Sequence, residues 1–441
     1  MMSLDKIKPL TRIRIKTINN EYEGLKIPSE EEKLLILKLD SGYNIGLKIK
    51  NIISIEVLEE PSKESKQGKK LVTITKNDSL TTIKLLHTGG TIASKVDYKT
   101  GGVVADFDPE AILELFPELK EIANIESEFL GNMFSDDFRF AHFNKIAKKI
   151  FEQYQKGKTK FIVTSGTDFL HYLSASLSFI LKDLSLAVMV VGSQRSSDRG
   201  SSDAGINLIC ATQFLANTDF EGVAVCMHEN SSDDTCLIIP GTNARKMHSS
   251  RRDAFKTINS RPIARIDYST RNITLLKELP KKSKKEKSKK NTEIKLLNEN
   301  LKIGMIYSRP NLFAEELKPY ENFDALILIG SGLGHFPITT NDKMTEENEK
   351  IFSELKKLSS KIPLVMTSQT INGRINMNVY SPARKLQEIG ILGNLSNMTI
   401  ETTYCKLAYL LSTGIQKKYL ADELLKNYCG EQEENDYMNF E

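Results

Sequence analysis

The most constraining feature of this chain is an apolar run at residues 184–191, LSLAVMVV. It is far shorter than the roughly 20 residues that a membrane-spanning helix needs. A strand with apolar residues at successive positions is typically buried on both faces, as in a parallel sheet with helices on either side. Residues 170–181 before it, LHYLSASLSFIL, have helix length, and a short apolar strand at residues 82–86 enters a glycine turn. This alternation predicts an α/β fold with a parallel sheet.

The first 60 residues have a different pattern, which indicates a separate small domain. Strand-like segments at residues 12–17, 33–39, 44–50 and 52–58 follow one another without helices. Short strands at this spacing favour a small all-β domain of barrel type. Residues 61–70, PSKESKQGKK, are nearly free of apolar residues, so we expect them to form a linker.

A second change in composition falls at residues 277–297. Seven of the ten residues 281–290 are lysine. This stretch is either a solvated spacer or a local contact for a phosphate backbone. Beyond it, apolar strands at residues 301–306 and 325–329 and a helix at residues 346–358 indicate a second α/β domain.

Together these changes predict how the chain is divided. Its 441 residues suit about three domains of ~100–200 residues each. We expect a β domain with its linker at 1–70, a first α/β domain at 71–276, a lysine-rich linker at 277–297 and a second α/β domain at 298–441. Residues 431–441 contain five carboxylates and no basic residue, so we expect an acidic, disordered tail.

Composition narrows the classes of function. The 61 Lys and Arg against 57 Asp and Glu leave a net charge of only +4, so any contact with nucleic acid should be local. Five cysteines without a CxxC spacing argue against a disulfide framework or a cysteine zinc site. The sequence has no HExxH and no GxxxxGK[ST] motif, so we expect neither a bound metal nor a nucleotide triphosphate. The N-terminus has no apolar signal region, and we expect a cytoplasmic protein without a membrane segment.

The first candidate for chemistry is HTGGTIAS at residues 87–94, directly after a strand. Its two glycines permit a tight turn whose amides can face a carboxylate or an oxyanion. Either flanking threonine, Thr88 or Thr91, could be a nucleophile if a base removes its proton. The alternative is a structural turn whose hydroxyls bond to the backbone.

Three further loops are polar and follow predicted strands. In TSGTDF, at residues 164–169, Asp168 stands beside Thr167 and could orient a lysine, or could instead cap the next helix. GSQRSSDRGSSDAGIN, at residues 192–207, suits either a polar site or a charged surface loop. In GTNARKMHSSRRD, at residues 241–253, Lys246 is either part of a site or a solvated charge. Ligands of open α/β sheets bind beyond the carboxyl ends of the strands, where these loops are expected.

HTGGTIAS, TSGTD and the GTNARKMHSS loop resemble, in order and spacing, the motifs of the bacterial-type L-asparaginase family. The likeness is closer to one branch, the D subunits of archaeal glutamyl-tRNA(Gln) amidotransferases. EYEGLKIPS…LKLDSGYNIG, GSQRSSDRGSSDAGINL and TSQTINGRINMNVYSPARKL resemble that branch rather than simple asparaginases. The resemblance covers nearly the whole chain except the lysine-rich linkers and the acidic tail. It implies two α/β domains of asparaginase type after the small β domain.

The resemblance also implies roles for individual residues. Thr91 matches the nucleophile, and Thr167, Asp168 and Lys246 match the residues that complete the hydrolytic group. The substrate-binding positions are Tyr98, which closes over the substrate, Ser135 and Asp136, which bind its α-carboxylate and α-amino groups, Gly90, and His335, near where the second α/β domain reaches the site in a neighbouring copy. We expect backbone amides of the Gly89-Gly90 turn or of the Thr167 region to stabilise the oxyanion.

The chain departs from the family pattern at three positions in these motifs. Asp136 stands where the family usually has Glu or Gln, Ser165 replaces a histidine, and Phe169 replaces a small polar residue. None of these changes removes a residue of the implied hydrolytic group. Phe169 either narrows the substrate pocket or packs structurally.

The function that the resemblance implies is hydrolysis of glutamine by a threonine nucleophile. The released ammonia would convert Glu-tRNA(Gln) to Gln-tRNA(Gln) on a partner, the E subunit, which uses ATP and Mg²⁺. This chain would bind no cofactor itself and would form a homodimer within a heterotetramer. One alternative is a free-standing cytosolic L-asparaginase. Another is a catalytically inactive homologue that serves as an assembly or tRNA-docking module.

Overall fold

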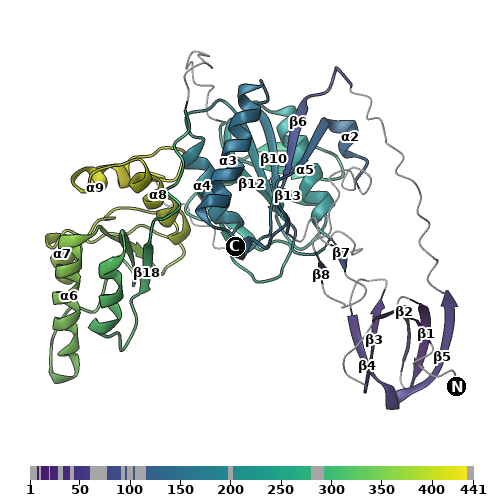
Figure 1. Ribbon diagram of the computed structural model, residues 1–441, viewed down its shortest axis with the longest axis horizontal. Helices are drawn as coiled ribbons and strands as arrows, with labels where there is room; N and C mark the ends of the chain where they lie inside the picture. Colours follow the sequence, from purple (N-terminus) through teal and green to yellow (C-terminus); the bar gives the residue numbers. More distant parts are fainter. Residues whose placement is uncertain are drawn as a thin grey trace.

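The computed structural model describes residues 7–8, 11–18, 20–27, 33–39, 44–59, 77–90, 95–96, 103–104, 116–196, 202–279 and 293–434. Two of the predicted site residues, Thr91 and Tyr98, lie outside the described residues, as do residues 61–70 and 281–290. Figure 1 shows three parts along the chain: an N-terminal β part, a central α/β part and a second, smaller α/β part.

The N-terminal part is an antiparallel sheet with the strand order β4-β3-β2-β1-β5. Its strands are β1 (Arg12–Thr17), β2 (Glu21–Ile27), β3 (Leu34–Leu39), β4 (Asn44–Lys48) and β5 (Ile52–Glu59), with the 3₁₀ turn η2 (Ile49–Asn51) between the last two. Ile13, Ile15 and Leu37 are fully buried in its own small core. An all-β domain is therefore confirmed, although no ladder joins β4 to β5 among its described residues. The prediction missed β2.

The central part is an eight-stranded sheet with the order β17-β16-β13-β12-β11-β10-β6-β9. Its strands are β6 (Thr82–His87), β9 (Asn124–Phe129), β10 (Lys160–Thr164), β11 (Ala187–Val191), β12 (Gly222–His228), β13 (Thr235–Pro240), β16 (Ala264–Asp267) and β17 (Ile273–Leu275). Two separate hairpins pair β7 (Lys95–Val96) with β8 (Val103–Val104), and β14 (Ala244–Lys246) with β15 (Phe255–Thr257).

This sheet is mixed, whereas the sequence pattern predicts a parallel one. The five strands from β9 to β12 are parallel, as expected, but β13, β16 and β17 are antiparallel additions. Only residues 229–234 separate β12 from β13. A parallel crossover needs a dozen or more residues, so this short connection can only form an antiparallel hairpin.

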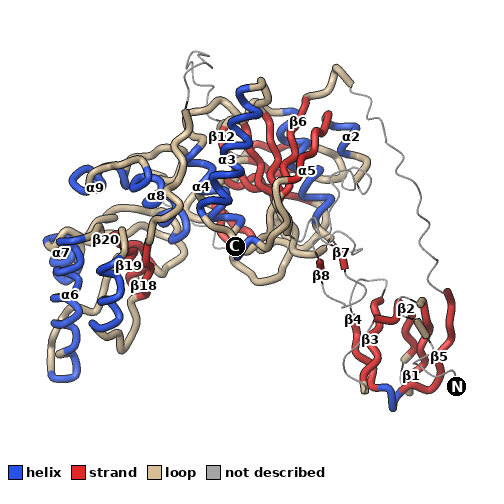
Figure 2. Tube along the Cα trace, viewed as in Figure 1, coloured by secondary structure: helices blue, strands red, loops and turns tan. Residues whose placement is uncertain are grey.

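Alternate residues of the central strands face two different cores, which explains their unbroken apolar runs. In β11, Val188 and Val190 pack with helices α3 (Phe140–Gln155) and α4 (Leu170–Ile180). Met189 packs on the other face with α5 (Ala204–Asn217) and α2 (Leu119–Ile122). Figure 2 shows the strands as a layer flanked by these helices. Since neither face of β11 meets water, nearly every position of the strand is apolar.

The second α/β part is a parallel sheet with the order β18-β19-β20. Its elements are β18 (Ile303–Tyr307), η5 (Ala314–Asn322), β19 (Ala325–Gly330), η6 (Lys343–Thr345), α6 (Glu347–Lys361), β20 (Leu364–Ser368), α7 (Ser381–Glu388), α8 (Ile400–Ser412) and α9 (Lys417–Leu425). No helix among the described residues has both the length and the apolar character needed to span a membrane.

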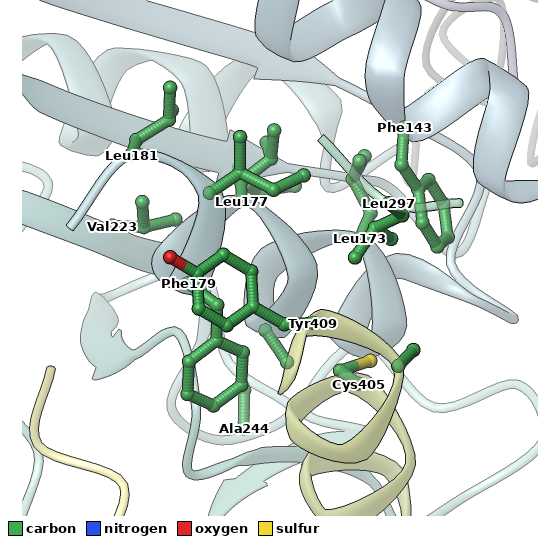
Figure 3. Close-up of a cluster of buried hydrophobic side chains, with 14 of the residues drawn as sticks. Phe143, Leu173, Leu177, Phe179, Leu181, Val223, Ala244, Leu297, Cys405 and Tyr409 are labelled. Carbon is green, nitrogen blue, oxygen red and sulfur yellow. The ribbon is translucent and has the colours of Figure 1, made fainter. Parts of the chain in front are cut away.

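Helix α8 joins the two α/β parts, because it packs against α4 and shares the core of the central sheet. Figure 3 shows Tyr409 and Cys405 of α8 beside Phe179, Leu177 and Leu173 of α4. The rings of Phe179 and Tyr409 stack with centroids 6.0 Å apart. Contacts of this kind make the two parts share one continuous apolar core.

The start of the predicted disordered tail is ordered, which corrects that prediction for residues 431–434. Glu431 and Lys406 are both fully buried and form an ion pair at 2.7 Å. The Glu431 carboxylate also accepts the backbone N–H groups of Tyr428 and Cys429. Burial lowers the pKa of Lys406. A buried charge pair needs such additional hydrogen bonds to offset its desolvation.

Residues beyond Glu431 contact both α/β parts. The Glu433 carboxylate accepts hydrogen bonds from Ser260 at 2.6 Å and from Lys277 at 2.5 Å, both in the first part. In the second part, Asn397 and Arg374 donate to the Glu433 carbonyl. We call residues 427–434 the C-terminal clasp.

We predict that Glu431→Ala lowers the free energy of unfolding by about 3–5 kcal/mol, because it leaves the Lys406 ammonium buried and unpaired. Urea denaturation of the full chain measures this change. Glu434→Ala is the matched control, since that side chain is exposed, and it should shift stability by less than about 0.5 kcal/mol. Equal losses in the two variants would contradict a stabilising role for the buried pair.

Candidate active site

The candidate site lies at the carboxyl edge of the central sheet, where four neighbouring parallel strands end. The four strands are neighbours in the order β9-β6-β10-β11. Their last residues pair: His87 with Phe129 and with Thr164, and Thr164 with Val191. The loops that begin HTGG, TSGTD and GSQR therefore leave the sheet side by side.

Glycines let these loops touch backbone to backbone. Gly90 has a φ of +82°, and a Cβ added there would lie 2.2 Å from the backbone nitrogen of Gly166. Gly89 has a φ of +100°, and its Cβ would lie 2.5 Å from the nitrogen of Met133. Atoms do not approach so closely, and the positive φ also favours glycine. The ends of β6, β9 and β10 are thus held together by contacts that only glycine allows.

Three predicted site residues from distant stretches meet at this edge. The Lys246 ammonium donates to Thr167 Oγ1 at 2.8 Å and to Asp168 Oδ1 at 2.8 Å. The Lys246 and Thr167 side chains are largely buried, whereas the Asp168 side chain is 64% exposed. A buried amine therefore links a buried hydroxyl to a carboxylate that reaches solvent. Such a chain can carry a proton between a reacting group and water.

The geometry decides between the alternatives that the sequence left open for these loops. Asp168 does not cap α4, because the N-cap position is Phe169 and no side chain caps the helix. Lys246 is not a solvated charge. Thr88 is buried, and its hydroxyl donates to the carbonyl of Thr164 at 2.9 Å. Of the two threonines in the glycine turn, Thr88 thus has the structural role.

Ser135 and Asp136 lie on the loop after β9, in the 3₁₀ turn η4 (Ser135–Asp137). Ser135 is buried, and its Oγ accepts the backbone N–H of Phe169 at 3.2 Å. Asp136 is exposed next to it. The structure therefore places both residues beside the Thr167–Asp168 loop.

Two buried histidines lie behind the site, and both are neutral. Burial lowers the pKa of His87 to about 3 and that of His171 to about 4. His87 Nδ1 lies 2.6 Å from Thr164 Oγ1. His171 Nε2 lies 3.9 Å from a Glu401 carboxylate oxygen, which is also 3.4 Å from the Arg245 guanidinium. The buried Glu401 carboxylate of α8 thus contacts β14 at Arg245, the residue directly before Lys246.

An aromatic cavity of about 540 Å³ borders the site. Residues of both α/β parts line it, including Phe138, Phe169, Tyr172, Ile303 and Tyr404. The rings of Phe169 and Tyr172 meet edge to face with centroids 5.2 Å apart. Phe169, one of the departures from the family pattern, thus both packs and lines this cavity.

The structure does not bring His335 to the site within one chain. The His335 backbone pairs with Ser331, and its ring contacts Tyr380 at 5.2 Å in the second α/β part. Ser165, another departure, is buried and donates to the Gly166 carbonyl at 3.0 Å. Within the described ranges, no group of three or more His, Cys, Asp or Glu side chains is suited to hold a metal ion.

Sequence reasoning assigned no role to the residues that pack around the hydrolytic group. Gly166 and Gly192 follow β10 and β11, and a Cβ on either would lie 2.9 Å from a side-chain atom of the neighbouring loop. A glycine one or two residues after a buried strand was the available signal. The pairing of Arg245 with Glu401 left no such signal, because the two residues lie in different domains.

Comparisons with known proteins agree with this fold along the chain. Residues 82–280 match the family "Asparaginase, N-terminal", and residues 302–422 match the "Glutaminase/Asparaginase C-terminal domain". Residues 7–58 match the "GatD N-terminal domain". The protein is thus of the asparaginase and glutaminase class, with an additional N-terminal domain.

Full-length relatives define the family more narrowly. The D subunit of the glutamyl-tRNA(Gln) amidotransferase of Methanococcus maripaludis is 38% identical over 95% of this chain and 96% of its own. The protein of the same name from Pyrococcus furiosus is 37% identical over 93% of this chain and 91% of its own. The chain belongs to the family of glutamyl-tRNA(Gln) amidotransferase D subunits.

Solved structures of asparaginases share the fold. The thermostable L-asparaginase from Thermococcus kodakarensis superposes with a TM-score of 0.68 at 26% identity, over 80% of this chain and 99% of its own. L-asparaginase I from Vibrio cholerae gives a TM-score of 0.65 at 24% identity, over the same shares.

We predict that Gly90→Ala destabilises the protein more than Gly157→Ala does. Both glycines have a positive φ, but an added Cβ meets backbone atoms only at Gly90 and has open space at Gly157. The left-handed conformation costs about 1–2 kcal/mol in each variant. Overpacking adds at least a further ~1–3 kcal/mol at Gly90 alone. Chemical denaturation measures the free energy of unfolding of both variants. Equal decreases would show that the backbones of Gly90 and Gly166 are not in close contact.

Proposed function

We propose that this chain is the glutamine-hydrolysing component of a tRNA-dependent amidotransferase, with Thr91 as its nucleophile. The observation that carries the proposal is the contact of Lys246 with Thr167 and Asp168 beside the Gly90–Gly166 junction. Thr91 follows Gly90 directly in the chain. The membership of the chain in the D-subunit family supports the same assignment.

In the proposed reaction, the Thr91 hydroxyl attacks the side-chain amide carbon of glutamine. The resulting oxyanion is stabilised by backbone N–H groups of the glycine turn or of the Thr167 loop. The Thr91 proton passes through the Thr167–Lys246–Asp168 chain to the amide nitrogen, which leaves as ammonia, and an acyl ester on Thr91 remains. Water then attacks this ester, and the same chain takes up a proton of that water and returns it to the Thr91 oxygen as glutamate leaves. Ser135 and Asp136 bind the α-carboxylate and α-amino groups, and Tyr98 closes over them.

When Glu-tRNA(Gln) and ATP are present, a partner consumes the ammonia. We propose that the E subunit of the amidotransferase activates the glutamate of Glu-tRNA(Gln) with ATP and Mg²⁺ and accepts the ammonia to form Gln-tRNA(Gln). In this division of labour the present chain binds glutamine but no ATP, metal or other cofactor of its own. It acts in the cytoplasm as a homodimer within a heterotetramer. In that dimer His335 approaches the site of the neighbouring copy.

A free-standing asparaginase is the second candidate, because solved asparaginases share the fold. However, the Thermococcus kodakarensis enzyme is matched over 99% of its length while a fifth of this chain lies outside the match. The N-terminal β domain also matches the "GatD N-terminal domain" rather than an asparaginase family. An inactive docking module is disfavoured because Thr167, Asp168 and Lys246 are present and in contact.

Steady-state hydrolysis of glutamine and asparagine separates these candidates. For the proposed function we expect glutamine to be preferred, and its hydrolysis to rise when the E subunit and tRNA(Gln) are added. Ammonia release by the isolated chain and by the reconstituted complex is the measurement. Vigorous asparagine turnover by the isolated chain would favour the asparaginase instead. No ammonia from the complex would favour the inactive module.

We predict that Thr91→Ala lowers kcat/KM for glutamine by at least about 10³-fold, because the acyl intermediate can no longer form. Thr88→Val is the matched control in the same motif. It removes a buried hydrogen bond to Thr164 and should cost about 1–3 kcal/mol of stability while retaining most of the activity. Near-normal hydrolysis by Thr91→Ala would exclude Thr91 as the nucleophile.

A further inference from the structure

The loop after β11, which begins with Gly192, has no role in the reaction proposed above, yet it touches the hydrolytic group. A Cβ added to Gly192 would lie 2.9 Å from Thr167 Cγ2, 2.9 Å from Leu170 Cδ1 and 3.1 Å from the Ser165 carbonyl. Thr167 therefore rests directly against the Gly192 backbone. Any shift of Gly192 would therefore move the backbone atoms against which the Thr167 side chain packs.

Asn207 of α5 holds the Gly192 backbone in place. Its side-chain amide donates to the Gly192 carbonyl at 3.0 Å and to Asp203 Oδ2 at 3.3 Å. Asn207 is fully buried, so these hydrogen bonds have no competition from water. Asp203 is also fully buried, and its carboxylate accepts the backbone N–H groups of Gln194 and Arg195. Two buried side chains thus position the first turn of this loop.

His228, the last residue of β12, orients Asn207 in turn. His228 Nδ1 lies 2.7 Å from Asn207 Oδ1. Because the Asn207 amide nitrogen donates to the Gly192 carbonyl and to Asp203, the amide oxygen faces His228 and accepts a hydrogen bond from Nδ1. On its other side, His228 Nε2 lies 3.3 Å from Asp233 Oδ1. His228 is fully buried, so its ring has a single fixed orientation.

We propose that Asn207 and His228 are positioning residues of the active site: they fix Gly192, and through it the Thr167 hydroxyl that Lys246 contacts. This inference rests on the proposed function and extends it to two residues that do not contact the hydrolytic group themselves. Their contribution is geometric. A displacement of Thr167 by a fraction of an ångström lengthens its 2.8 Å contact with Lys246 and slows the proton transfer.

The test uses three variants and a matched control. Asn207→Asp keeps the shape of the side chain but removes the donor to Gly192. His228→Leu removes the donor to Asn207, whereas His228→Asn places an amide nitrogen where Nδ1 lies. Thr212→Val is the control, because Thr212 is equally buried on α5 and its hydroxyl donates only within the helix, to Leu208.

We expect Asn207→Asp and His228→Leu to lower kcat for glutamine by about 10–100-fold with KM changed by less than about twofold. His228→Asn should recover most of this loss, and Thr212→Val should lower the melting temperature without lowering kcat. A general loss of stability would not lower kcat while leaving KM and the control variant's kcat unchanged in this way. A folded Asn207→Asp protein with wild-type kcat overturns the inference. If that variant does not fold, equal kcat in His228→Leu and the wild type overturns it.

A crystal structure of Asn207→Asp separates this inference from the proposed function. If the wild-type chain does not hydrolyse glutamine, the proposed function fails, but the positioning role can still be measured as a distance. We expect the Thr167 Oγ1 to Lys246 Nζ distance to exceed about 3.5 Å in the variant, beyond the ordinary range of a hydrogen bond. An unchanged distance of 2.8 Å would overturn the positioning role whatever the activity.

Discussion

The direct contact between Gly90 and Gly166 is the constraint on which the candidate site depends. Adjacent parallel strands are about 4.8 Å apart, and side chains at their tips would normally keep the following loops separate. Here the loops after β6 and β10 meet backbone to backbone. This contact fixes the position of Gly166, directly before Thr167, relative to Gly90. The chemistry of the site therefore depends on two positions that contribute no functional group.

The sequence predicts those parts of the fold that rest on local patterns. The alternation in Arg12–Thr17 and the apolar run ending at Val191 are local, and the structure confirms a strand at each. Strand Glu21–Ile27 was missed because its acidic residues and Gly24 hide the pattern, and its position comes from pairing with a strand on each side. The order of Glu431 was missed for a similar reason, since its partner Lys406 is on a different element.

In the candidate site, too, the residues of the motifs could be predicted from the sequence, whereas the role of the residues around them could not. Thr167, Asp168 and Lys246 could be named because they stand in loops of unusual composition that match a family. Glu401, which supports them, occurs in an ordinary helical sequence, and Asn207 ends a polar stretch for which the sequence left two interpretations open. Their position depends on how helices pack onto the sheet, and the local pattern of one sequence does not specify such packing. Prediction from sequence therefore reached the groups proposed to react and missed the groups that orient them.

The C-terminal clasp has a consequence for how the protein is made. Ser260 and Lys277 belong to the first α/β part, yet the carboxylate that binds them, Glu433, lies 156 residues after Lys277 in the sequence. During synthesis from the N-terminus, the central sheet can assemble while the second domain is still being translated. The contacts of Glu433 with both parts become available only after the whole second domain as far as this residue has been made. Until then, the newly made central sheet lacks the clasp and the packing of α8, and its exposed apolar face needs protection from aggregation.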